Sequence, residues 1–220
     1  MGELNLSRLR FIALAVVCAL LVSVAGCSRK GPVSVRFVRD VDKAGLEQLS
    51  KQGGDIVLLT DAAFWTDRIS TRAVPIARRS KTYIIGPGAS QMAGDMLSRM
   101  FDEVEIVRRL DHVPNLGRYD FVIQLFLDEF DDRTLSVPLF SNLRYLVELG
   151  AEVSRSDGTV VGRVEGLGTE SFWFRNLAAA NPYRSDERLR EKASTTLNAA
   201  VQESLFELME ELEELFDTLP

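Results

Sequence analysis

Four acidic residues, Asp128, Glu129, Asp131 and Asp132, form the densest short acidic cluster ahead of the C-terminal segment. Paired carboxylates can act as general acid and general base, or they can bind calcium through their oxygens. The spacing of these four does not match an EF-hand loop, and the cluster lies where an alternating strand is predicted to end. We therefore favour a solvated strand end, and a hydrolase that uses residues 128–132 is the least favoured function.

The single histidine, His112, precedes Val-Pro in a predicted loop. A Ser/His/Asp nucleophile arrangement would have to use this histidine. The sequence contains no Gly-x-Ser-x-Gly elbow, and the nearest context, Gly88-Ala89-Ser90, lacks the second glycine. A histidine on the surface is the favoured interpretation. We expect no catalytic residue and no enzymatic activity.

Gly86-Pro87-Gly88 stands between a predicted strand and a predicted helix, where a phosphate could bind at the helix N-terminus. The segment lacks the Lys-Ser/Thr of a P-loop and the spacing of a dinucleotide fingerprint. A structural turn is therefore favoured, and we expect no cofactor.

The first 26 residues have the layout of a secretory signal. Arg8 and Arg10 give a positive start, and residues 11–22 form an apolar run that is too short for a bilayer crossing of about 20 residues. Small residues follow, and Val24-Ala25-Gly26-Cys27 resembles the lipobox of bacterial lipoproteins. The alternative is a short membrane helix with an incidental cysteine.

The lipobox resemblance implies that Cys27 becomes the N-terminus, with a diacylglycerol on its thiol and a further acyl chain, such as palmitate, on its amine. Several acyl chains give stable anchoring, so we expect the membrane to be a partner. Ser28, in place of an aspartate after the cysteine, implies the periplasmic face of the outer membrane, with inner-membrane retention less favoured.

The mature chain then has no cysteine chemistry, because Cys18 leaves with the signal and Cys27 carries lipid. No disulfide is expected, and a His/Cys zinc site is excluded, so no metal is expected. The mature chain holds 24 basic and 31 acidic residues, a net charge of −7. An acidic domain gives no electrostatic footprint for nucleic acid, so we expect none as partner.

The sequence predicts a tether at 27–32 and a single α+β domain at 33–220. The tether reaches less than roughly 20 Å, so the domain should sit close to its membrane. Apolar alternation and turn signals predict a mixed, largely antiparallel sheet with helices on one face. Asp157-Gly158 is typical of a two-residue hairpin turn. Strands are predicted at 33–38, 55–60, 82–85, 104–107, 121–127, 143–154 and 159–171, and helices at 41–52, 90–101 and, long and amphipathic, 186–217.

Two groups of consecutive aromatic residues lie at or near loops: Phe64 and Trp65, and Phe172, Trp173 and Phe174. Neighbouring residues of an extended chain point to opposite faces, so they cannot all enter one core. Core packing with a partly buried tryptophan is favoured. The alternative is a rim that binds a partner or touches the membrane, together with the acidic face of the terminal helix.

The order of elements resembles the YajG-type lipoproteins and, more distantly, the LptE-type and PqiC-type envelope lipoproteins. The likeness rests on layout: Tyr83-Ile-Ile-Gly86, the helix ending at Met100-Phe101, residues 119–125, the Asp157-Gly158 hairpin and the final helix. Residues 39–81 depart from it. The resemblance implies a non-catalytic accessory or scaffold subunit in envelope assembly or transport, with an envelope protein as partner. The alternative is a periplasmic lipid or small-molecule binding module.

Overall fold

The structure is a computed structural model that describes residues 33–34, 49–60, 62–66, 69–71, 81–137, 140–175 and 187–219. The predicted signal, Cys27 with its tether, and most of the helix predicted at 41–52 lie outside these residues. Residues 49–52 are described and are not helical. No helix in the described ranges is both long enough and apolar enough to cross a membrane.

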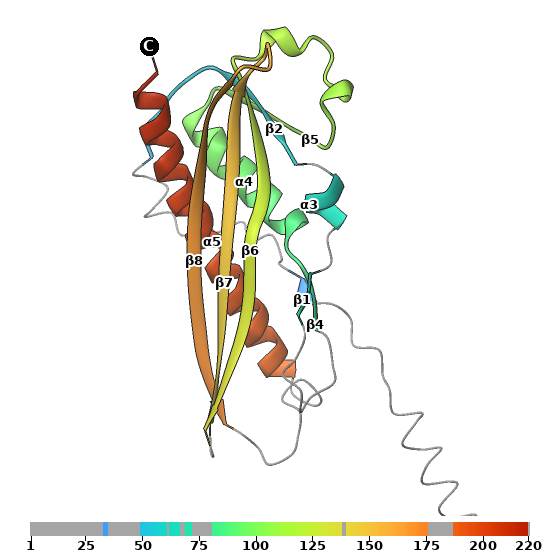
Figure 1. Cartoon of the computed structure of the whole chain (residues 1–220), viewed down its shortest axis with the longest axis vertical. Helices are drawn as coiled ribbons and strands as arrows, with labels where there is room; N and C mark the ends of the chain where they lie inside the picture. Colours follow the sequence, from blue (N-terminus) through green and yellow to red (C-terminus); the bar gives the residue numbers. More distant parts are fainter. Residues whose placement is uncertain are drawn as a thin grey trace, which may run out of the picture. The chain divides into compact units, whose positions relative to one another are not determined.

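The described chain alternates strands and helices in its first half and is antiparallel sheet followed by one long helix in its second half (Figure 1). The elements are β1 (Val33–Ser34), β2 (Asp55–Leu59), α3 (Ala62–Thr66), β3 (Ile69–Thr71), β4 (Lys81–Ile84), α4 (Gly86–Met100), β5 (Glu103–Val107), two short 3₁₀ helices (Leu110–His112 and Leu116–Arg118), β6 (Phe121–Val137), β7 (Phe140–Arg155), β8 (Val160–Arg175) and α5 (Glu187–Asp217).

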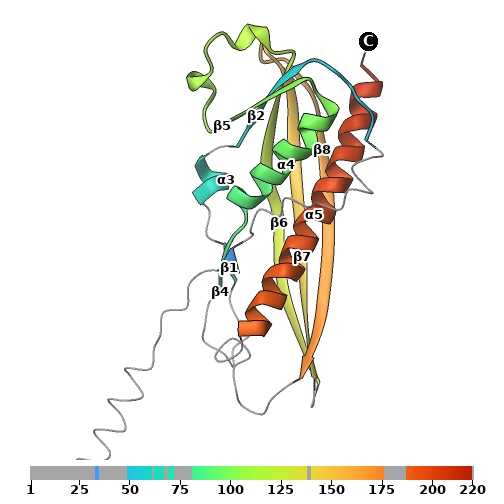
Figure 2. The same cartoon turned by 180° about the vertical axis from the view of Figure 1, so that it is seen from behind.

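Five strands form the main sheet in the order β5-β2-β6-β7-β8. The β2 strand pairs in parallel with β5 and β6, whereas β6, β7 and β8 are antiparallel and much longer. Helices α4 and α5 both lie on one face of this sheet, as two opposite views show (Figures 1 and 2). This is the predicted α+β fold, and the hairpin and the long terminal helix are both confirmed. The two-residue turn is wrong: Arg155 bonds to both Thr159 and Gly158, so the loop has three residues, 156–158, and only Gly158 has a positive φ.

The central strand β2 is apolar throughout because both of its faces are covered. Ile56 and Leu58 point into the main core under α4, whereas Val57 and Leu59 belong to a second, smaller core on the other face. The segment with the two 3₁₀ helices, between β5 and β6, covers this second core and contributes the buried side chains of Val113 and Tyr119. An uninterrupted apolar run is the expected pattern for a strand that is buried on both sides.

Helix α4 begins at Gly86, four residues before the predicted start, so Gly86-Pro87-Gly88 forms its first turn. Proline is tolerated there because the first N–H groups of a helix have no partner within the helix. Gly86 is required by the approach of α3: a Cβ at this position would lie 1.8 Å from the Phe64 carbonyl oxygen. The predicted structural turn is thus the contact point of two helices.

Helix α5 lies directly on the backbone of β7 and β8. A Cβ on Gly166 would lie 2.1 Å from the Ser204 carbonyl oxygen, and one on Gly168 would lie 1.8 Å from that of Ala200. The Ser204 hydroxyl donates to the Gly166 carbonyl at 2.7 Å, and it accepts from the Leu149 N–H at 3.1 Å. One buried hydroxyl therefore joins the helix to two strands.

Two glutamates of α5 bind the outer edge of β8. The Glu203 carboxylate accepts from the Thr169 N–H at 2.6 Å, and that of Glu207 accepts from the Leu167 N–H at 2.5 Å. Residues four apart on a helix lie on one face, which matches the spacing of alternate N–H groups along a strand edge. Part of the predicted acidic face is therefore engaged within the molecule.

A second sheet, in the order β1-β4-β3, joins the start of the domain to the long strands. Val33 pairs with Tyr83, whose ring lies 4.8 Å from that of Phe130. The Tyr83 hydroxyl donates to the Asp132 carboxylate at 2.7 Å. The first described residues are thereby fixed against the middle of β6.

Gly168→Ala should destabilise the fold by at least about 2 kcal/mol, because the added methyl would meet the backbone of α5 and the helix would have to move outward. Chemical denaturation followed by circular dichroism measures the change. Gly117→Ala is the matched control, because its Cβ would find no described atom closer than 3.9 Å, and it should stay within about 0.5 kcal/mol of wild type. Equal effects of the two changes would contradict the close packing described above.

Candidate functional site

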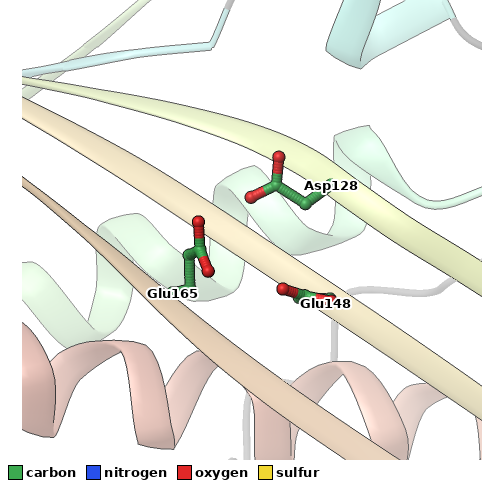
Figure 3. A group of neighbouring side chains, drawn as sticks. All are labelled: Asp128, Glu148 and Glu165. Carbon is green, nitrogen blue, oxygen red and sulfur yellow. The ribbon is translucent and has the colours of Figure 1, made fainter.

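Three carboxylates from three neighbouring strands meet on the face of the sheet opposite the helices (Figure 3). Asp128 comes from β6, Glu148 from β7 and Glu165 from β8, and their oxygens lie within 4.8 Å of one another. Within the described part of the chain, no other three acidic, histidine or cysteine side chains come together so closely. We refer to these three residues as the carboxylate group.

A bulge in β6 gives Asp128 its place in this group. The pairing of β6 with β7 shifts between Leu127 and Glu129, so Asp128 is the additional residue. Its side chain lies over Gly150, where a Cβ would be only 2.4 Å from the carboxylate. The group thus depends on an irregular strand and on a missing side chain opposite it.

Arg163 supplies the positive charge of the site. Its Nη2 atom lies 2.8 and 3.0 Å from the two oxygens of Asp128, and its Nε atom lies 3.2 Å from Glu165. The guanidinium stacks over the Phe126 ring at 4.4 Å from the centroid. Arg163 and Glu165 are two residues apart on β8, so they share the face on which Asp128 lies.

The pKa of Glu148 is raised above its ordinary value of 4.5. Partial burial is the largest cause, followed by the negative charges of Glu165, Asp128 and Glu129, while Arg163 opposes the shift. Asp128 and Glu165 each bond to Arg163. Glu148 is therefore the member of the group whose negative charge is least compensated by the arginine.

The geometry favours an ion-pair network over a catalytic centre or a cation site. Carboxylate oxygens are ligands that calcium prefers, but both Asp128 oxygens already bond to the guanidinium. A divalent cation would have to displace Arg163, which itself supplies the counter-charge. The group is therefore an ion-pair network on an exposed sheet face, in which Arg163 compensates Asp128 and Glu165.

The structure does not assemble the predicted 128–132 cluster. The strand was predicted to end there, which is wrong: β6 continues to Val137. Asp131 bonds to Arg133, and Asp132 bonds to Tyr83. Successive residues of a strand point to opposite faces, so these acids separate.

His112 lies in the first 3₁₀ helix with 67% of its side chain exposed, and its Nε2 atom is 3.8 Å from the Asp111 carboxylate. This agrees with a surface histidine.

The predicted aromatic residues occupy three kinds of environment. Phe64 and Phe172 are buried in the main core, and Phe174 packs at its border. Trp65 is partly buried: its Nε1–H donates to the Thr60 hydroxyl at 2.6 Å, and Arg108 stacks 3.9 Å from its ring centroid. Trp173, in contrast, is 55% exposed on the outer face of β8. Among these five, Trp173 has the side chain that is open to a membrane or a partner.

No protein-family model matches the chain, and no curated protein matches it. Among solved structures, a hypothetical protein from Chlamydia trachomatis is 11% identical, with 74% of this chain and 98% of that chain covered and a TM-score of 0.44. The minor lipoprotein from Acinetobacter baumannii is 10% identical, with 76% and 93% covered and a TM-score of 0.38. A protein from Caulobacter crescentus described as a lipoprotein is 16% identical, with 61% and 84% covered and a TM-score of 0.35.

Glu148→Gln should stabilise the protein at neutral pH and have no such effect at acidic pH. The pKa of Glu148 is raised in the folded state, so the wild type loses stability as pH rises from about 4.5 through the raised pKa. The variant lacks this loss because its amide stays neutral. Melting temperatures at pH 7 and pH 4 measure the effect.

Glu152→Gln, the same change on the same face of β7 but outside the carboxylate group, is the control. It should not reproduce the stabilisation that Glu148→Gln gives at pH 7. A stabilisation by Glu148→Gln that persisted unchanged at pH 4 would contradict the electrostatic explanation.

Proposed function

We propose that this chain is a membrane-anchored lipoprotein of the cell envelope and serves as a non-catalytic accessory or scaffold subunit in envelope assembly or transport. The observation that carries the proposal is the Val24-Ala25-Gly26-Cys27 segment behind a signal-like N-terminus. Val33, six residues after Cys27, already pairs with β4 of the folded domain. Acylation of Cys27 would therefore hold the domain close to a membrane, and Ser28 favours the outer membrane.

The packing of α5 supports a scaffold more than a lipid-binding module. A binding module would need an apolar cavity between the sheet and the terminal helix. Instead, Gly166 and Gly168 bring the two backbones into contact, and the α5 residues that face the sheet are closely buried: Ala193, Leu197, Ala200, Val201, Leu205, Leu208 and Leu212 are at most 1% exposed.

The charged groups of the described residues also support a non-catalytic role. The Asp128 carboxylate is already bonded to the Arg163 guanidinium, and His112 is an exposed residue beside Asp111. Towards its C-terminus α5 presents the exposed carboxylates Glu210, Glu211 and Glu214, which a basic surface of an envelope protein would complement.

Cys27→Ser should abolish acylation, because the serine hydroxyl cannot replace the thiol that takes the diacylglycerol. Labelling with a palmitate analogue, intact mass and membrane fractionation measure this outcome. Cys18→Ser is the matched control, because it removes the other cysteine of the chain and leaves Cys27, so label and membrane association should persist. If Cys27→Ser kept its processing and its membrane association, and the wild type carried no acyl chain, the anchor proposal would fail.

Affinity capture from detergent-solubilised membranes should recover an envelope protein in a constant ratio to the wild-type chain. Glu210→Lys with Glu214→Lys should reduce this recovery by reversing the charge of the exposed end of α5. Glu191→Lys, an exposed change near the other end of the same helix, is the control. Native mass spectrometry that found a stoichiometric lipid and no protein would instead favour the binding module.

A further inference from the structure

The long strands β6, β7 and β8 end in a patch of exposed apolar side chains on the face away from α5. Leu135 is 63% exposed, Trp173 is 55% exposed and Phe140 is 43% exposed. Leu135 and Trp173 flank Asn142 on either side in the strand pairing, so the three form one row across the sheet. Phe140 lies two residues before Asn142 on β7 and therefore on the same face.

The row next to this patch is basic. It consists of Arg133, Arg144 and Ser171, which pair across the three strands, and both arginines are exposed. From this row to the tip, the described side chains of the outer face include no carboxylate. Asp131, which bonds to Arg133, lies in the next row of the outer face, further from the tip. We call Leu135, Phe140, Trp173, Arg133 and Arg144 the tip patch.

The residue types of the tip patch suit a lipid headgroup region. Tryptophan combines a large apolar ring with one polar N–H and is favoured where one end is apolar and the other wet. Arginine can place its aliphatic stem along apolar groups and its charge in the headgroups. The three exposed apolar side chains in the described part of the tip also make a patch smaller than the about 20–30 residues that each partner contributes to a stable protein interface.

The start of the domain lies towards the same end of the sheet as the tip patch (Figure 1). Val33 pairs with Tyr83, and Tyr83 bonds to Asp132 of β6. Leu135 is three residues further along β6, roughly 10 Å at the rise of a strand. The tether from Cys27 to Val33 spans at most about 20 Å. A membrane that holds Cys27 would therefore lie within reach of both β1 and the tip patch.

The acidic end of α5 lies at the opposite end of the sheet. Phe216 packs 4.9 Å from Phe121, the first residue of β6. Phe121 precedes Leu135 by 14 residues, roughly 45 Å along the strand. The carboxylates near Phe216 are therefore far from the tip, and the arginines would meet anionic lipid instead.

We propose that the tip patch inserts into the headgroup region of the same membrane that holds Cys27, so that the sheet stands on the lipid surface at a second point of contact. This inference rests on the proposed acylation of Cys27. A single tether leaves a domain free to rotate, whereas two contacts fix its orientation. The acidic end of α5 would then face away from the bilayer.

The depth of Trp173 in a bilayer tests this proposal. The lipidated mature chain is reconstituted into phosphatidylethanolamine/phosphatidylglycerol vesicles, with and without bromine on the acyl chains, which quenches nearby tryptophan. A Trp65→Phe variant leaves Trp173 as the emitter, and its fluorescence should lose most of its intensity in the brominated vesicles. Trp173→Phe leaves Trp65 as the emitter, whose N–H bonds to Thr60 and whose ring stacks against Arg108. The fluorescence of this variant should be the same in brominated and unbrominated vesicles.

A second pair of variants separates the patch from general proximity to the membrane. Leu135→Ser with Phe140→Ser, in the Trp65→Phe background, should reduce the quenching of Trp173. Val160→Ser, an equally exposed apolar position at the other end of β8, should not. Circular dichroism of each variant must match that of wild type.

The outcomes distinguish this inference from the anchor proposal. Acyl chains on Cys27 without quenching of Trp173 would overturn the tip patch and leave the anchor intact. Absence of acyl chains would remove both. Trp173 emission could instead change with protein density to the same extent in both vesicle types. That result would indicate contact between copies of the chain and would also overturn the inference.

Discussion

The contact between the backbones of α5 and β8 is the constraint on which the rest of the fold depends. Glycine at positions 166 and 168 lets the helix approach so closely that no side chain could fit between them. The Ser204 hydroxyl then satisfies one N–H of β7 and one carbonyl of β8 in a place that water cannot reach. Buried backbone groups need such partners, so the close approach and the serine have to occur together. With α5 fixed, the apolar faces of β6, β7 and α4 complete one core around it.

Much of this architecture could be predicted from local patterns, because those patterns have local physical causes. Asp157-Gly158 marks the position of the hairpin because Gly158 adopts a positive φ of 86°, although the loop has three residues instead of two. The apolar stripe of α5 gave its position to within a residue. The start of α4 was missed because Gly86-Pro87-Gly88 looks like a break, whereas its glycine serves a contact with α3 from a distant part of the chain.

The carboxylate group could not be predicted because strand register decides it. Pairing shifts between Leu127 and Glu129 and again between Val153 and Ser154. A shift of one residue turns every following side chain to the other face, so no count along the sequence places Asp128 beside Glu148 and Glu165. The four acids at 128–132 were conspicuous as neighbours in sequence, yet alternation separates Asp131 from Asp132. Trp173 was foreseeable as one of three consecutive aromatic residues, but not its neighbours Leu135 and Phe140.

The carboxylates of Glu203 and Glu207 have a consequence for a chain held at high surface density. An outermost strand with free N–H groups is a template on which a neighbouring molecule can add its own strand, and two-dimensional confinement would raise the frequency of such encounters. By occupying the amides of Leu167 and Thr169, these two side chains leave less of β8 open to that pairing. The helix that completes the hydrophobic core thus also shields the domain from polymerisation along its own border.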